Sequence, residues 1–398
     1  MRLLYYTVSF LLAILWIPVY TEQEKKESRW RIMSVLRKAR ETMSARERVR
    51  RTFAFEKTDR VPIGYEANPG IHARLCGALG IPAGDLEAAW QALGVDIRPI
   101  QPPYVGPELF KAPENRRVDP LEGYVMRWVA HDTGGYWDFC DFPLQGAGDE
   151  LFDAYPMPDP DDFDYQAAYE RAKAYGGQYA LYTGHPGVPD IIDSNGRLMG
   201  MEDVLCHLVL ENGAALRFIR RRAAYQLAIL ERTLEACRGA IDFLWLGEDL
   251  GTQIAPMISL ELYRKLIRPL HRQFVELAEA YAIPVLIHTC GSSSWVYEDF
   301  IEMGVRGVDT LQPEAANMSP AYLAAHFGGR LNFRGCISTA GPLAFGTAAE
   351  TAAVCLQTLK TLMPCRGYHF APTHAIQDNT PVENVLAMYQ AAHNFGTY

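Results

Sequence analysis

The stretch "DFLWLGEDLGTQIAPMISLELYRKLIRPLHRQFVELAEAYAIPVLIHTCGSSS", residues 242–294, decides the fold. It begins with the apolar run "DFLWLG" and ends with a second one, "PVLIH", and each run breaks into small or polar residues, as buried strands do at their ends. Between them, residues 260–282 have the apolar periodicity of a helix, and Pro269 predicts a kink in it. A strand, a helix and a second strand in this order predict two parallel strands joined by a crossover.

Similar apolar segments recur along the whole chain. Eight of them end in glycine or polar residues, beginning at Val61, Leu93, Tyr179, Asp242, Pro284, Gly307, Arg330 and Gly367. The segments between them include clear helices, such as residues 216–234 and 348–363. Eight alternating units predict an α/β fold closed into a (β/α)₈ TIM barrel. An open doubly wound sheet is the alternative, but no G-x-G-x-x-G motif follows the first strand.

The barrel is expected to span residues 43–398. Ser44 lies in "MSARERVRRTFAF", and Glu47 three residues later predicts a capping box at the start of a helix. Residues 1–42 form a separate extension whose apolar run, "LLYYTVSFLLAILWIPVY", has marginal length for a membrane span. A signal peptide, a membrane anchor and a start assigned upstream of Met33 or Met43 are the three interpretations of this segment.

An insertion interrupts the alternation after the second strand. Residues 100–162 are rich in proline, aspartate and aromatic residues, and "YVMRWVAHDTGGYWDF" predicts a β-hairpin that turns at Asp132 to Gly135. An insertion at this point would lie over the carboxyl ends of the barrel strands, where such enzymes bind substrate. A surface elaboration without a ligand role is the alternative.

Composition excludes several classes of function. The chain has 398 residues, a net charge of -9 and no block of lysine and arginine, so nucleic acid is not an expected partner. The 8 cysteines are scattered without a repeated spacing, which is typical of reduced thiols in a cytoplasmic protein. We expect contact with a membrane only if the N-terminal run is a true anchor.

Polar residues at the predicted strand ends converge on one face of a barrel. They are Glu66, Asp96, His185, Glu248, Asp249, His288, Cys290, Gln312, Glu314, Cys336 and His374. This set is rich in metal ligands, and its carboxylates suit acid, base or cation-binding roles.

His288 and Cys290 are two residues apart, so on an extended strand their side chains share a face. Thiolate and imidazole together suit Zn²⁺, which needs three protein ligands in a catalytic site. His374 is the expected third ligand, and Glu248 or Cys336 could complete the set. The alternative is a neutral buried histidine beside a packed thiol.

The other strand-end residues have competing interpretations. Glu248 and Asp249 are adjacent, so only one of them is expected to point into the barrel mouth, and helix capping is the alternative for both. Asp96 could instead form a salt bridge with Arg98. His185 lies between a glycine and a proline in "TGHPG", which favours a substrate-binding role.

Gln312 and Glu314, in "LQPEA" after the sixth predicted strand, complete the expected substrate contacts together with His185 and Asp249.

With these residues in place, residues 44–397 resemble the uroporphyrinogen decarboxylase superfamily. The resemblance is carried by "MSARERVRRTFAFEKTDRVPIGY", "WLGEDLGTQIAPMISLELYRKLIRPLHRQF", "HTCGSSSWVYEDFIEMGVRGVDTLQPEAANMSP" and "YHFAPTHAIQDNTPVENVLAMY". This superfamily contains a tetrapyrrole decarboxylase and zinc-dependent methyltransferases that work with methyl-corrinoid proteins.

The decarboxylase branch holds its substrate's carboxylates with arginines after the first strand and centres the pyrroles on an aspartate after the second. Asp96 matches that aspartate in place, but "PIGYEANPGIH" contains no arginine. Metal-free decarboxylation of uroporphyrinogen or a related carboxylic acid is therefore the alternative function. It requires basic residues from the insertion, such as Arg116, Arg117 or Arg127, to line the pocket.

The methyltransferase branch is the closer match. It implies zinc held by an H-x-C after the fifth strand, here His288 and Cys290, and by a cysteine after the eighth, where this chain has His374. The resemblance implies a zinc-assisted methyltransferase that acts on a methoxy or methylated small molecule, or with a corrinoid supplied by a partner protein. Asp96, Glu248 and His374 are the expected catalytic residues. A non-catalytic protein that binds a corrinoid or tetrapyrrole is a third hypothesis.

Overall fold

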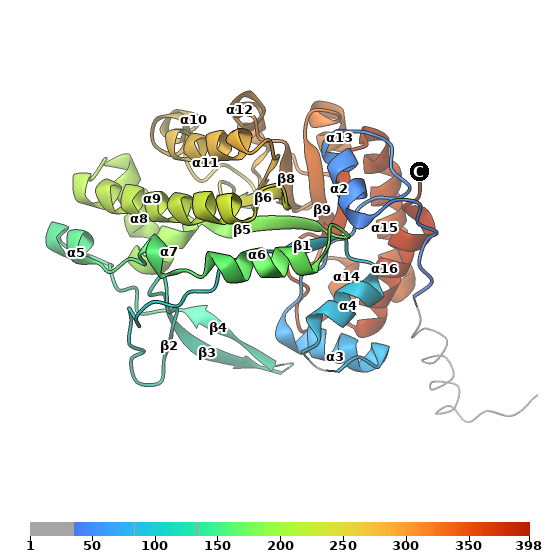
Figure 1. Ribbon diagram of the computed structural model, residues 1–398, viewed down its shortest axis with the longest axis horizontal. Helices are drawn as coiled ribbons and strands as arrows, with labels where there is room; N and C mark the ends of the chain where they lie inside the picture. The colour runs from blue at the N-terminus through green and yellow to red at the C-terminus, as the bar shows by residue number, and fades with distance from the viewer. Residues whose placement is uncertain (1–35, 83, 133) are drawn as a thin grey trace, which may run out of the picture.

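A computed structural model describes residues 36–82, 84–132 and 134–398. Its main sheet is parallel throughout and has the strand order β1-β5-β6-β7-β8-β9-β10 (Figure 1). The strands are β1 (Ile97–Pro99), β5 (Ala180–Pro189), β6 (Ile241–Gly247), β7 (Val285–His288), β8 (Gly307–Leu311), β9 (Asn332–Ile337) and β10 (Tyr368–Pro372). Six of the predicted strands are thus confirmed in β5 to β10.

The first predicted strand lies between the two edges of this sheet. On one side, Gly64 donates its N–H to the carbonyl of Phe370 and Pro62 accepts from the N–H of Phe370, each at 2.8 Å. On the other side, the carbonyl of Ile63 accepts from the N–H of Asp96, just before β1, at 2.9 Å. The parallel sheet is therefore curled, and the α/β fold resembles a TIM barrel.

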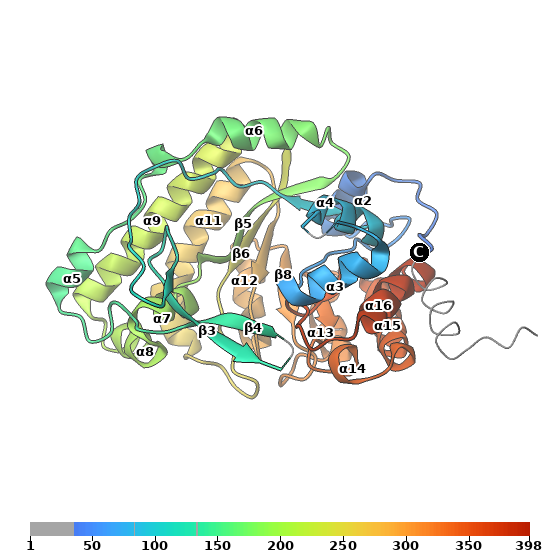
Figure 2. The same ribbon diagram turned by 90° about the horizontal axis from the view of Figure 1, so that it is seen from below.

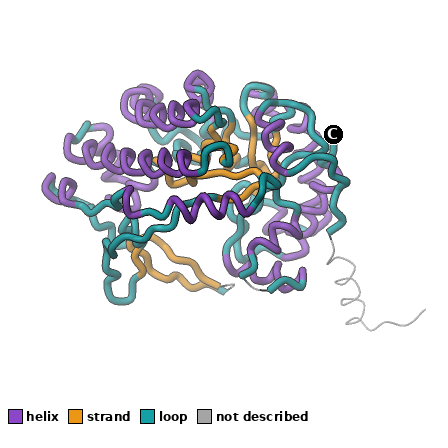
Figure 3. The backbone as a smooth tube through the Cα atoms, viewed as in Figure 1, coloured by secondary structure: helices purple, strands orange, loops and turns teal. Residues whose placement is uncertain are grey.

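Helices cover the outside of the curled sheet (Figure 3). They are α2 (Ala45–Phe53), α3 (Pro69–Leu79), α4 (Leu86–Leu93), α5 (Asp149–Ala154), α6 (Tyr165–Ala174), α7 (Asp193–Met199), α8 (Met201–Val209), α9 (Gly213–Ala236), α10 (Leu260–Leu262), α11 (Arg268–Ala280), α12 (Tyr297–Met303), α13 (Pro320–Phe327), α14 (Pro342–Phe345), α15 (Ala348–Leu362) and α16 (Val382–Phe395). The three helices predicted from periodicity correspond to α9, α15 and the α10 to α11 region. The irregularity expected at Pro269 is a π-helical turn, Tyr263–Ile267, directly before α11. Proline has no N–H for the carbonyl four residues earlier, so the wider turn falls where that bond is missing.

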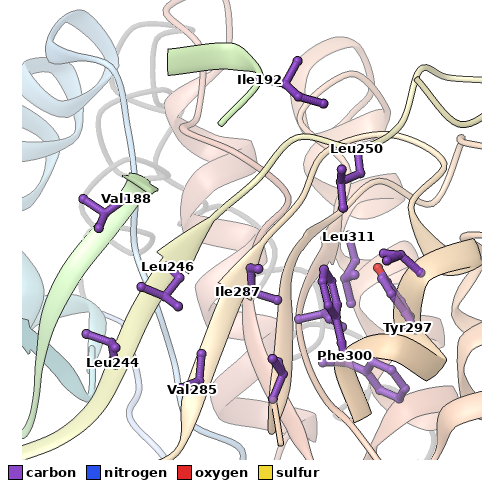
Figure 4. Packing of buried hydrophobic residues seen from close by; sticks show 14 of the residues in the cluster. Val188, Ile192, Leu244, Leu246, Leu250, Val285, Ile287, Tyr297, Phe300 and Leu311 are labelled. Atoms are coloured by element: carbon purple, nitrogen blue, oxygen red, sulfur yellow. The ribbon is translucent and has the colours of Figure 1, made fainter. Parts of the chain in front are cut away.

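The core lies between the strands and the helices. Every residue of β6, β7, β8, β9 and β10 is buried, as expected for parallel strands that are covered on both faces. Leu246 of β6 and Ile287 of β7 belong to the same apolar cluster as Tyr297 and Phe300 of α12 (Figure 4). This continuous packing fixes the carboxyl ends of the strands relative to one another.

The insertion forms a small antiparallel sheet of β2 (Arg117–Val118), β3 (Val125–His131) and β4 (Gly134–Phe139). The expected hairpin is present, but Gly134 and Gly135 pair with His131 and Ala130 and so belong to β4 rather than to the turn. The ring of Phe139 lies 4.7 Å from the guanidinium of Arg197 in α7.

The other end of the hairpin reaches the segment that follows β10. A Cβ atom placed on Gly134 would lie 3.5 Å from a carboxylate oxygen of Asp378. Because α7 follows β5 and Asp378 follows β10, the small sheet spans the carboxyl side of the barrel strands (Figure 2). This is the placement that the sequence predicted.

At the N-terminal boundary, the hydroxyl of Ser44 accepts the N–H of Glu47 at 3.1 Å and caps α2, which confirms half of the predicted capping box. The carboxylate of Glu47 pairs with Arg51 instead of returning to Ser44. The residues just before it are attached to the barrel, because Thr42 and Met43 both donate their N–H groups to Asp59. The apolar run of the extension lies outside the described residues. No described helix combines the length and the hydropathy that a bilayer span requires.

Candidate metal centre

Three of the predicted site residues come together at the carboxyl end of the barrel. His288 is the last residue of β7, Cys290 follows it by two positions, and His374 follows the end of β10 by two. One ligand atom from each lies within 4.8 Å of the other two, and His288 Nε2 is 3.5 Å from Cys290 Sγ. The sequence-predicted trio is therefore confirmed as a group that could hold a metal ion.

Two neighbours from β8 fix the imidazole of His288. Its Nδ1 lies 2.6 Å from the hydroxyl of Thr310 and 3.2 Å from a carboxylate oxygen of Asp309. With Nδ1 engaged, Nε2 is the atom left to face Cys290. Histidines that ligate metals typically make this second hydrogen bond to a carboxylate, because it fixes the ring and its tautomer.

Adjacent residues of a regular strand point to opposite faces, yet Asp309 and Thr310 both reach His288. An irregularity in β8 explains this: its pairing with β9 shifts between Val308 and Leu311, and Thr310 has a φ of +61°. A β-branched residue in the left-handed region is strained, at a cost of about 1–3 kcal/mol. The strained backbone lies directly beneath the candidate ligands.

A buried chain of charges continues behind Asp309. The guanidinium of Arg334 in β9 donates to Asp309 at 2.6 Å and also pairs with Glu66, and it lies 4.5 Å from the centre of the Trp245 ring. Burial alone would raise the pKa of Asp309, but Arg334 and His288 outweigh it and lower that pKa to about 2. Asp309 is thus a permanent anion beside His288.

The same neighbours act on His288. Burial lowers its pKa, but the hydrogen bonds to Asp309 and Cys290 outweigh burial and raise the pKa well above its ordinary value. These neighbours therefore favour the protonated imidazole, and a metal ion bound at Nε2 would have to displace that proton.

The loop that carries Cys290 is held by two of the predicted substrate-binding residues. Asp249 accepts the N–H of Cys290 at 2.7 Å, and Gln312 accepts the N–H of Gly291 at 2.8 Å. A Cβ on Gly291, whose φ is +69°, would lie 2.2 Å from the carbonyl oxygen of Gly251. Asp249 and Gln312 thus position the ligand loop, and backbone packs against backbone beneath it.

Glu248 points away from this group, and the capping interpretation fits its contacts. Its carboxylate is fully buried and accepts the N–H groups of Ile191 and Ile192 at 2.8 and 3.0 Å, just before α7. It also lies 3.0 Å from Nε2 of His271. Burial raises the pKa of Glu248 to about 8 although both amides oppose the shift. Glu248 lies outside the group of three potential ligands.

The structure corrects the placement of Asp96. Asp96 was expected at the end of the second strand, but β1 begins one residue after it, so it lies at the opposite end of the barrel from His288. It is 1% exposed, forms ion pairs with Arg48 and Arg60, and accepts the N–H of Ile63 at 2.6 Å. Arg98, its partner in the alternative interpretation, pairs with Glu87 instead.

The remaining predicted residues are distributed around the mouth. Glu314 is exposed, and Cys336 is buried outside the metal-binding group, where burial raises the pKa of its thiol. His185 lines a separate cavity beside α9. The sequence reasoning missed Asp309, Thr310 and Arg334.

The insertion arginines are engaged within the insertion. Arg116 pairs with Asp141, and Arg127, exposed to solvent, lies 3.6 Å from Asp138. Arg117 is exposed and lies over the ring of Trp137 at 5.8 Å. These contacts leave them poorly placed to serve as the pocket cations that the decarboxylase alternative requires.

Comparison with known proteins finds a family match for the C-terminal half of the chain. Residues 207–395 match the family of uroporphyrinogen decarboxylase (URO-D). Over these residues the predicted superfamily resemblance is confirmed. The matched URO-D region contains β6 to β10 and hence His288, Cys290 and His374. No curated protein matches the chain.

Among solved structures, the URO-D-like fold is similar to that of a methyltransferase from Methanosarcina mazei. The TM-score is 0.62 at 15% sequence identity, and the match covers 89% of this chain and 99% of the other. At this identity the likeness supports the shared fold over nearly the whole chain.

Proposed function

We propose that this URO-D-like chain is a zinc-assisted methyltransferase. The observation that carries the proposal is the group of His288, Cys290 and His374, with ligand atoms within 4.8 Å of one another. Zinc binds thiolate at about 2.3 Å and imidazole at about 2.0–2.1 Å, and three protein ligands are typical of its catalytic sites. Two such ligands at a tetrahedral angle lie about 3.5 Å apart. His288 Nε2 and Cys290 Sγ have this separation of 3.5 Å.

Zinc bound at this site would supply a Lewis acid that lowers the pKa of an acceptor thiol or polarises a methoxy oxygen. The chain's own residues prepare the site. Asp309 and Thr310 hold Nδ1 of His288, and Arg334 keeps Asp309 ionised. Asp249 holds the backbone of Cys290 in place. We propose a methoxy or methylated small molecule as the substrate and a partner protein as the carrier of a corrinoid.

The charges around the site support methyl transfer over decarboxylation of a polycarboxylate. Such a substrate requires cations that are free to pair with it, because burying unpaired carboxylates is costly. Arg334 is the buried cation behind the candidate ligands, and Asp309 and Glu66 already neutralise it.

The first experiment measures metal in the full-length protein purified without added metal. We expect close to one zinc per chain, and we expect Cys290→Ser and His374→Ala to lose it. Cys206→Ser and His326→Ala are the matched controls, because both residues are exposed and lie outside the group. A folded protein without zinc, or full zinc in both site variants, would contradict the proposal.

The second experiment tests the reaction itself. The zinc-loaded protein is mixed with reduced cob(I)alamin and methylated thiols, amines or methoxyarenes, and formation of methylcobalamin is followed by absorbance. Activity that disappears in Cys290→Ser supports methyl transfer. Release of CO₂ from carboxylated tetrapyrroles by the zinc-free protein would favour the decarboxylase alternative instead.

A further inference from the structure

Charge is unevenly distributed between the two ends of the barrel. The chain has a net charge of -9, yet residues 37–57 contain 8 lysine and arginine residues against 3 acidic ones. This segment includes α2, which covers the amino ends of the strands: the side chain of Asn332, the first residue of β9, donates to the carbonyl of Phe53 at 3.4 Å. Arg46 of α2 pairs with Asp242 at the start of β6. We call this end, formed by residues 37–57 and the loops that lead into β6 to β10, the base. It lies opposite the metal centre.

Three exposed cations from separate parts of the sequence lie together on the base. Lys57 follows α2, Arg306 directly precedes β8, and Arg366 lies two residues before β10. Phe55 and Arg306 line the same hollow of about 840 Å³, and a Cβ on Gly367 would lie 2.7 Å from the ring of Phe55. All three cations are exposed, and none forms an ion pair within the described residues. The fold therefore creates a cationic surface that the sequence does not show as a block of lysine and arginine.

The anions of the base leave this positive charge uncompensated. The carboxylate of Asp242 accepts from two arginines of α2, so it is neutralised. Glu56 lies 3.9 Å from Arg51, and Glu279 is exposed in the wall of the hollow. An excess of cations on one face of an acidic protein attracts a polyanion to that face.

The residues that precede the base indicate which polyanion it faces. Residues 3–20 are an apolar run without a charged residue. The described chain then begins at residue 36 beside the base: Lys38 donates to the carbonyl of Gln91 near the end of α4, and Ala39 donates its N–H to His393 near the end of α16. An apolar segment and a cationic surface at the same end of a molecule are two signals that together hold a protein on an anionic membrane. Nucleic acid would use the cations but not the apolar run.

We propose that the base is a docking surface for an anionic phospholipid bilayer. Residues 3–20 insert into the bilayer, and Lys57, Arg306 and Arg366 face its phosphate headgroups. The metal centre and the insertion, at the opposite end of the strands, then face the aqueous phase. The proposal concerns a different surface from the zinc site, so it stands or falls independently of the methyl-transfer function.

The first test is flotation of the full-length protein with vesicles of phosphatidylcholine alone or of phosphatidylcholine mixed with phosphatidylglycerol. We expect the unmodified protein to float with both. The double variant Leu12→Asn, Leu15→Asn keeps the chain length but weakens insertion of the apolar run, so we expect it to float only with phosphatidylglycerol present and to be released by high salt. Failure of the unmodified protein to float with the anionic vesicles would overturn the proposal, and so would equal binding of the double variant to both compositions.

Charge reversal on the base isolates the electrostatic contribution. In the Leu12→Asn, Leu15→Asn background, the added changes are Lys57→Glu, Arg306→Glu and Arg366→Glu. We expect them to weaken binding to the anionic vesicles by at least about 100-fold, because each cation near an anionic membrane contributes several-fold to the affinity. The matched control alters net charge equally on the insertion and α9, with Lys111→Glu, Arg117→Glu and Arg220→Glu, all of them exposed residues. Equal losses in the two triple variants would overturn the assignment of the base.

Hydrogen exchange of the unmodified protein tests the orientation and needs no variant to fold. We expect the anionic vesicles to slow exchange in α2 and to leave β3 and β4 unchanged. Slower exchange in the insertion with no change in α2 would overturn the proposed orientation. A duplex RNA that binds the double variant as tightly as the anionic vesicles do would overturn the lipid assignment in favour of nucleic acid.

Discussion

At the scale of single residues, the candidate site depends on partners that surround the ligands. His288 lies in contact with Asp309, and Asp309 lies in contact with Arg334, so three charged or polar side chains from β7, β8 and β9 form one buried row. A histidine that ligates a metal through one nitrogen becomes a stronger ligand when the other nitrogen donates to a carboxylate. The row therefore sets how tightly His288 can hold an ion.

Asp309→Asn is the direct test of this row. The amide keeps the shape of the side chain but removes its charge, so we expect zinc affinity to fall by roughly 10- to 100-fold. Competition with a chromophoric chelator measures the change. Because the substitution also leaves Arg334 with one fewer anionic partner, the double variant Asp309→Asn, Arg334→Met is the control: it should regain stability without regaining affinity. Unchanged zinc affinity in Asp309→Asn would show that the row has only a structural role.

Glu248 provides a pH-dependent prediction. Its pKa is raised by burial to about 8, above its value in the unfolded chain, so its stabilising contribution is complete below about pH 4 and is lost as the pH rises toward 8. We expect Glu248→Gln to flatten the fall in unfolding free energy between pH 5 and pH 8, measured by urea denaturation. The same substitution at exposed Glu170 should leave the slope as it is. Glu248→Gln should also retain zinc, and loss of the metal would instead indicate a fourth ligand.

At the scale of elements, the ligand loop after β7 is shaped by the loop after β6. Gly251 and Gly291 allow the two backbones to touch, since a Cβ on either residue would lie 2.2–2.5 Å from the backbone of the other loop. Gln312, after β8, ties the same loop from its other side. Cys290 is thus positioned by contacts from the segments that follow both neighbouring strands.

Gly291→Ala tests this packing, and Gly329→Ala is its matched control. Both glycines have positive φ, +69° and +74°, but a Cβ on Gly329 would meet nothing within 4 Å. We expect the control to cost about 1 kcal/mol of unfolding free energy from backbone strain alone. Gly291→Ala should cost more than this and should lower zinc content, since the loop must move. Equal effects on stability with full zinc in both variants would contradict a tightly packed loop.

The elements also show where sequence patterns suffice. Strands β6 to β10 are continuous apolar runs because both faces are covered, and the sequence predicts all five. The prediction of a strand that begins at Leu93 is wrong. Leu93 is the last residue of α4 and Gly94 caps that helix, so β1 begins only at Ile97. That shift moved Asp96 from the expected end of a strand to its start.

At the scale of the whole molecule, the convergence of strand ends explains why the ligand trio could be predicted from distant positions. His288 and His374 are far apart in sequence, yet the TIM-barrel-like fold brings their rings to 5.9 Å. The partners Asp309 and Thr310 could not be predicted, because their directions depend on an irregularity in β8 that no local pattern signals. Arg334 had a usable signal, since "RLNFRG" places a charged residue inside an otherwise buried strand.

A buried ion pair joins the insertion to the barrel. Arg222 of α9 is buried and pairs with Glu122 of the insertion, and this pair is joined by the hydroxyls of Tyr124 and Tyr225. Removing one partner of a buried ion pair leaves the other charge buried and unpaired, which costs about 3–5 kcal/mol. The loss should fall on the insertion first, because the pair joins Glu122 of the insertion to α9 and neither residue lies in a barrel strand.

We therefore expect Arg222→Met to raise hydrogen exchange in β2, β3 and β4 while β6 to β10 stay protected. Arg217→Met is the matched control on the same helix: its pair with Asp153 is half exposed, so the change should cost less than about 1 kcal/mol. Glu122→Gln in the Arg222→Met background should restore part of the protection, because it removes the unpaired carboxylate of Glu122. Uniform loss of protection over the whole chain would mean that the pair of Arg222 and Glu122 supports the barrel itself. No change in protection would mean that other contacts hold the insertion, such as that of Phe139 with Arg197.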